Sequence, residues 1–89
     1  MITDFEKFKL EVGDYVIWKP AQWLPDRTRS LVENKIGKIV EIRKDLDEVD
    51  IYYGGDIGTL VGVSIDKIEY WSKDKKDCET YLAAKKYNI

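Results

Sequence analysis

Five short runs of β-branched and aromatic residues, separated by turn residues, most strongly limit how this chain can fold. In one of them, Val49, Ile51 and Tyr53 alternate with other residues and so share one face of a strand. We expect the runs to form strands at residues 15–18, 36–43, 49–53, 59–65 and 68–71. Short strands at this spacing are typical of a small, mainly β barrel, closed or nearly closed.

The connection between the first two runs, Lys19 to Lys35, is unusually long. It holds both prolines, Pro20 and Pro25, and it lacks a sustained period of two. We interpret it as a long loop, because long loops in compact domains more often carry function than not. Trp23 lies between the prolines, either tucked over the core or displayed to a partner.

The two ends of the chain have helical character. Near the C-terminus, three apolar residues follow the i, i+3, i+4 spacing of one helix face: Cys78, Tyr81 and Leu82. This spacing predicts a helix over about residues 73–87, capped by Ser72 or Asp74 and packed on the sheet. Near the N-terminus, Thr3 and Glu6 fit a capping box, which allows a helical turn there.

The length and composition suit one small domain. The chain has 89 residues, of which 44% are hydrophobic, and it includes three Trp and six Tyr residues. The first residues include early acids and no apolar run, so we expect no signal peptide. We therefore expect one cytoplasmic domain over residues 1–89, with the barrel at about 8–71 and no membrane span.

Charge is nearly balanced overall but is separated along the chain. The net charge is −2, which argues against a strongly basic nucleic-acid-binding domain. Residues 15–44 hold seven basic and three acidic residues, whereas residues 45–56 hold five acidic and no basic ones. We interpret the acidic stretch as a solvated hairpin. Two stretches of opposite charge on different loops would orient encounters with a partner.

Several kinds of chemistry lack the residues they need. The chain contains no histidine, which removes the commonest general base and the Ser/His and Cys/His pairs. Cys78 is the single cysteine, so an internal disulfide and a Cys-based zinc site are excluded, and we expect it to be a buried structural residue. We therefore expect no enzymatic activity, no cofactor and no metal site.

Four segments also resemble a known template in their order and spacing. They are Gly13-Asp14-Tyr15-Val16-Ile17-Trp18, Gly37-Lys38-Ile39-Val40-Glu41-Ile42, Val49-Asp50-Ile51-Tyr52-Tyr53 and Val63-Ser64-Ile65-Asp66-Lys67-Ile68. Together they resemble the SH3-like barrels of KOW and Tudor modules. The resemblance implies five strands, with a short 3₁₀ turn between the last two. Because this fold serves many roles, the resemblance implies no ligand.

The candidate binding residues lie mainly in and around the long connection. Trp23 is the first candidate, because Trp and Arg are the preferred anchors of interfaces. Arg27 and Arg29 are either solvated or available for forked contacts to a carboxylate or phosphate. The basic residues Lys19 and Lys35 extend this set. Strand parity points Tyr52 outward, either as a cross-strand filler or as part of a binding face.

Three functions remain open at this point. The first is a protein-binding module or a small regulator or inhibitor, of the kind that phages direct against host machinery, acting through the long connection. The alternative is a KOW-like nucleic-acid-binding module that uses the basic 19–44 stretch, with Trp23 stacking on a base. A third, purely structural role would use an edge strand for assembly. The acidic balance favours a protein partner, and the oligomeric state stays undetermined.

Overall fold

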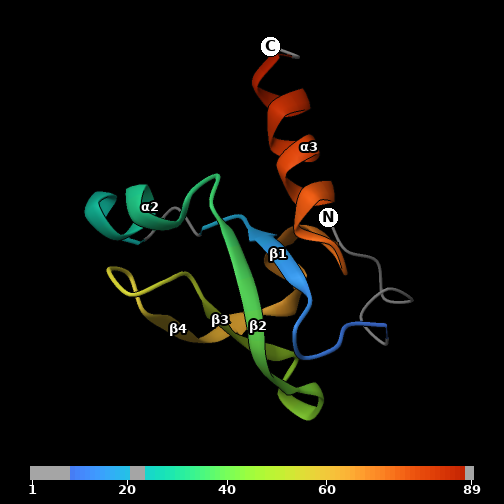
Figure 1. Cartoon of the computed structure of the whole chain (residues 1–89). Coiled ribbons are helices and arrows are strands. Elements are labelled where there is room, and N and C mark those ends of the chain that lie inside the picture. The colour runs from blue at the N-terminus through green and yellow to red at the C-terminus, as the bar shows by residue number, and fades with distance from the viewer. Residues whose placement is uncertain (1–8, 21–23, 88–89) are drawn as a thin grey trace.

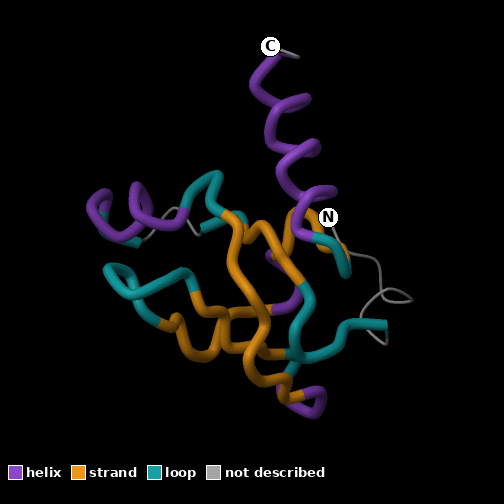
Figure 2. The backbone as a smooth tube through the Cα atoms, in the orientation of Figure 1, coloured by secondary structure: helices purple, strands orange, loops and turns teal. Residues whose placement is uncertain are grey.

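The computed structural model describes residues 9–20 and 24–87 (Figure 1). Five strands form a single antiparallel sheet in the order β4-β3-β2-β1-β5 (Figure 2). They are β1 (Tyr15–Trp18), β2 (Ile36–Arg43), β3 (Glu48–Tyr52), β4 (Thr59–Ser64) and β5 (Ile68–Ser72). The five predicted strands are confirmed, each to within one residue at either end. The predicted helical turn at Thr3 to Glu6 lies outside the described residues.

The sheet is open in the part of the chain that the structure describes. Strands β4 and β5 lie at its two edges, and no pairing joins them there. The closed form of the predicted barrel is therefore not observed, although the mainly β architecture is confirmed. A 3₁₀ turn, Ile65–Lys67, links β4 to β5, as the sequence predicted.

Irregularities in the strand pairing bend the sheet around its core. Val40 is an extra residue on β2, between the paired residues Ile39 and Glu41. On β4, Val61 and Gly62 together lie opposite one residue of β3, Asp50. Gly62 has a φ of 75°, a conformation that costs least for glycine. Such bulges increase the local twist and let a short sheet curve over a small core.

Gly37 serves close packing and is not itself the position of a bulge. It is buried in β2, and a Cβ placed there would overlap Ile51 Cγ2 and lie 3.0 Å from Tyr53 Cε1. Strand β2 therefore needs glycine so that two large side chains can cross it.

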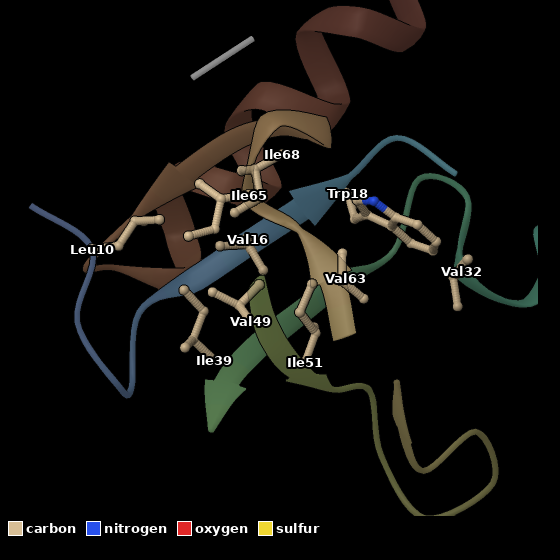
Figure 3. Close-up of a cluster of buried hydrophobic side chains, with 10 residues drawn as sticks. All are labelled: Leu10, Val16, Trp18, Val32, Ile39, Val49, Ile51, Val63, Ile65 and Ile68. Carbon is tan, nitrogen blue, oxygen red and sulfur yellow. The ribbon is translucent and has the colours of Figure 1, made fainter. Parts of the chain in front are cut away.

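The main core cluster draws on every strand. Ten buried residues form it: Leu10, Val16, Trp18, Val32, Ile39, Val49, Ile51, Val63, Ile65 and Ile68 (Figure 3). Leu10 lies at one end of the cluster, and Trp18 and Val32 lie near the other (Figure 3). Trp18 is only 8% exposed, and its β1 neighbours Val16 and Ile17 are fully buried.

The long connection between β1 and β2 is only partly a loop. Its second half forms helix α2, Asp26–Val32, so the prediction of a loop throughout Lys19 to Lys35 was wrong there. The helix begins after Pro25 and has one fully buried residue, Val32, which is 1% exposed. Seven residues make fewer than two helical turns. Such a segment is too short for apolar residues to display the helical period in the sequence. Packing of Val32 in the core, rather than intrinsic helical preference, holds the helix.

Helix α3, Lys75–Tyr87, packs across β5, β1 and β2. Asp74 caps it, because its Oδ1 accepts the Lys76 backbone N–H at 3.0 Å. The Tyr81 ring stacks on Tyr70 of β5, with centroids 4.4 Å apart. The Tyr81 hydroxyl also donates to Glu69 at 2.8 Å. The C-terminal turns of α3 extend beyond the sheet (Figure 1), so the helix adheres to it mainly by its first half.

The acidic stretch from residue 45 to residue 56 is not uniformly solvated. Asp50 on β3 is 7% exposed, and both its carboxylate oxygens accept hydrogen bonds from Arg43. The backbone N–H of Gly62 donates to the same carboxylate at 3.0 Å. These contacts lower the pKa of Asp50 to about 2, with the Arg43 hydrogen bond as the largest cause. The predicted charge separation is therefore partly cancelled by a contact between the two stretches.

Candidate functional site: an apolar groove beside an edge strand

A groove of about 290 Å³ lies between the long connection and β4. Its described lining comprises Trp18, Leu24, Leu60, Val61, Gly62, Val63, Ser64 and Lys67. Most of these side chains are apolar, and Val61 is 72% exposed. Leu24 packs against the core cluster, which holds the long connection against this side of the sheet. Concave, mostly apolar surfaces with a few polar groups at the margin are typical of binding sites.

The structure places the predicted site residues on several separate segments. Trp23, the first candidate, lies outside the described residues, although its neighbour Leu24 lines the groove. Lys19 follows β1 and is exposed. Lys35 is exposed in the short segment between α2 and β2. Tyr52, at the end of β3, is 44% exposed, which confirms that it points outward.

Arg27 and Arg29 both lie on α2 but do not form one forked site. Residues two apart on a helix point in different directions. Arg29 also forms an ion pair with Asp26 one turn earlier, whereas Arg27 is exposed. The sequence-based picture of two arginines flanking Trp23 on a loop is therefore corrected by the helix that carries them.

The residues of β4 that line the groove were missed by sequence reasoning. The run Thr59–Ser64 contains no charged residue and no proline. Strand β1 is equally uncharged, but β1 lies between β2 and β5, where neighbours cover it. An uncharged run becomes unusual only once its strand is known to be an edge. The strand order, which local sequence does not specify, was the missing information.

Among the described residues, two buried side-chain polar atoms lack hydrogen-bond partners. They are Nε1 of Trp18, a residue that lines the groove, and the Tyr53 hydroxyl, near the start of β2. Buried donors of this kind are rare, because losing water without gaining a partner costs free energy. Trp18 is thus a residue of the groove lining whose indole N–H makes no hydrogen bond.

A second surface crosses the outer face of the sheet. Tyr15, Lys38 and Tyr52 are cross-strand partners on β1, β2 and β3 and so form a continuous row. Lys38 Nζ lies 5.8 Å from the centroid of the Tyr15 ring. The row borders a shallow depression of about 210 Å³ that also includes Lys75. Aromatic rings and lysines on a sheet face offer stacking and phosphate contacts together.

The chemistry available elsewhere in the described chain is limited. Cys78 is fully buried, and burial together with Asp77, Asp74 and Glu79 raises the pKa of its thiol to about 11. A thiol in that state stays protonated and is a poor nucleophile. Across residues 9–20 and 24–87, no three His, Cys, Asp or Glu residues are grouped to hold a metal ion. Within the same residues, no helix is long and apolar enough to cross a bilayer.

Comparison with known proteins gave no relative: no family model, no curated protein and no solved structure matches this chain.

Proposed function

We propose that this chain is a non-catalytic protein-binding module, a small regulator or inhibitor, whose site is the apolar groove between the long connection and β4. The groove itself carries the proposal, because it exposes Val61 beside the buried Trp18 and the half-buried Leu24. A partner's apolar side chain would remove this surface from water, which is the main driving force of association. The overall acidic charge also favours a protein partner over nucleic acid.

The proposed fold family is the SH3-like barrel. Five antiparallel strands, bulges in the outer strands and a 3₁₀ turn before β5 support this assignment. The sequence analysis placed the site in the long connection. We propose instead the groove that Leu24 of this connection helps to line. A cytoplasmic location is part of the same proposal.

The proposal is tested by selecting binders for the full chain from a random library of linear peptides. We expect an enriched motif with a large apolar residue, and at least a tenfold loss of affinity on Val61→Glu. Val40→Glu is the matched control, since Val40 is also an exposed strand valine but does not line the groove. Selection that yields no motif, or peptides that bind Val61→Glu as well as the unaltered chain, would reject the groove as the site.

The second candidate function is binding of single-stranded nucleic acid on the row formed by Tyr15, Lys38 and Tyr52. The alternation of ring, cation and ring across three strands is the observation that favours it. The test is a salt titration with labelled single-stranded DNA and RNA. Affinity that falls steeply with salt, and that is lost on Tyr52→Ala with Lys38→Ala, supports the candidate. Absence of binding at low salt removes it.

A further inference from the structure

The two edge strands of the sheet, β4 and β5, differ in their contacts with helices. Strand β5 packs against α3, through the stack of Tyr70 on Tyr81 and the ion pair of Lys85 with Glu69 at 2.9 Å. Strand β4 has no such helix packing among the described residues, and it pairs on one side alone, with β3. Its outer side therefore presents main-chain N–H and C=O groups without a neighbouring strand.

Strand β4 also lacks most of the devices that keep natural edges from pairing. Edge strands are usually blunted by lysine, proline, inward-pointing charges or bulges. The sequence Thr59–Ser64 has no charge and no proline, and its exposed Val61 adds an apolar side chain. The one device present is the bulge at Val61 and Gly62, which Asp50 holds through the Gly62 N–H. An uncharged edge strand with an exposed apolar side chain is suited to pairing with a strand of a partner protein.

We infer that the partner binds β4 as an extended strand, adding a sixth strand to the sheet with one of its apolar side chains in the groove. Main-chain hydrogen bonds give such complexes affinity, and the pocket for a side chain gives them specificity. This inference rests on the proposed function, since it specifies how a protein partner would use the same groove.

Charge at one end of the groove specifies the partner further. Lys67 lines the groove, and its backbone carbonyl accepts a hydrogen bond from the Lys19 backbone N–H at 2.9 Å. Both lysines are exposed, and among the described residues Lys67 forms no ion pair, whereas Lys19 interacts electrostatically with Glu69. The bound segment therefore carries an acidic residue, placed at this end of β4, as well as an apolar one.

The same charge argues against a second copy of this chain as the occupant. The uncovered edge that a second copy would offer is β4 itself. Strand β4 contains no acidic residue, and antiparallel pairing of two copies would bring only Asp56, in the turn before β4, toward Lys67 and would set the bulge at Val61 and Gly62 against the same bulge of the second copy. A different protein with an extended, acidic and apolar segment fits the site better.

The experiment uses the peptides selected above, each also synthesised with single N-methyl groups along its backbone. N-methylation removes an amide donor, and donors in a strand face the neighbouring strand at every second residue. We expect methylation at one parity to weaken binding at least tenfold and methylation at the other parity to change it less than twofold. Amide hydrogen exchange of β4 should slow when the unmodified peptide binds.

A charge exchange tests the acidic position. Lys67→Glu with Lys19→Glu should weaken binding at least tenfold, and replacing the peptide's acidic residue by lysine should restore it. Lys86→Glu, near the exposed end of α3, is the control and should leave affinity unchanged.

The outcomes separate the two proposals. If Val61→Glu abolishes binding but N-methylation has no effect at either parity, the groove is the site and strand addition is wrong. If the chain alone self-associates with protection of the β4 amides, the occupant is a second copy and this inference is overturned. If no peptide binds at all, the proposed function fails first.

Discussion

At the scale of single residues, Asp50 is the polar side chain on which the local structure most depends. It is nearly buried, it is paired with Arg43, and it holds the bulge of β4 through the Gly62 N–H. Breaking a buried pair by removing one partner is costly, because the other charge is left without compensation. This residue therefore links the hairpin of β2 and β3 to the shape of the β4 edge.

The lowered pKa of Asp50 predicts how stability depends on pH. Its folded-state pKa of about 2 lies below the ordinary value of 3.8, so its contribution is full above about pH 4. That contribution is lost as the pH falls toward 2, because the unfolded chain binds the proton first. We expect Asp50→Asn to lower the urea midpoint at pH 5 and to flatten its decline between pH 4 and pH 2. Asp45→Asn, in the exposed 3₁₀ turn Lys44–Leu46 between β2 and β3, is the control. An unchanged decline in the Asp50 variant would contradict this explanation.

The hydroxyl of Tyr53 predicts a stabilising substitution. The oxygen is buried without a partner, and burial raises the pKa of the phenol. Tyr53→Phe removes the unsatisfied group and keeps the ring, so we expect the free energy of unfolding to rise by about 1 kcal/mol. Urea denaturation followed by fluorescence measures the change. A loss of stability would mean that the hydroxyl has a bound water as its partner.

At the scale of elements, strand β2 is the one whose packing tolerates least change. It pairs with both β1 and β3, and Gly37 lets Ile51 and Tyr53 cross it closely. We expect Gly37→Ala to destabilise the fold by about 1–3 kcal/mol, through overpacking against Ile51 and Tyr53. Gly55→Ala is the matched control, because a Cβ there meets nothing within 4 Å and its φ is not positive. Equal stability of the two variants in urea would show that β2 can shift to make room.

The strands and the C-terminal helix were predictable because their signals are local. Alternating residues, turn glycines and the spacing of Cys78, Tyr81 and Leu82 each lie within one segment. Helix α2 was missed because it is short and depends on one contact, that of Val32 with the core. The groove was missed because it joins Trp18 and Leu24 to residues 60–67, which are distant in sequence. Its existence follows from strand order and edge position, which local patterns do not specify.

At the scale of the whole molecule, the main core cluster makes the fold cooperative. The core cluster joins all five strands and α2, whereas Ile17 of β1 and Cys78 of α3 are buried outside it. We expect Val32→Ala to lower the global free energy of unfolding by about 2 kcal/mol rather than only loosening α2. Circular dichroism and tryptophan fluorescence should report the same transition in urea. Two separate transitions would show that α2 and the long connection unfold on their own.

The helix laid over β5 has a consequence for stoichiometry. Because α3 packs on β5, whereas no comparable helix packs on β4 among the described residues, we expect each chain to extend its sheet through β4. A strand that pairs with β4 occupies this edge, so the product is a complex of finite size and not an extended fibre. A protein with one edge strand available for pairing can thus keep that strand apolar without polymerising.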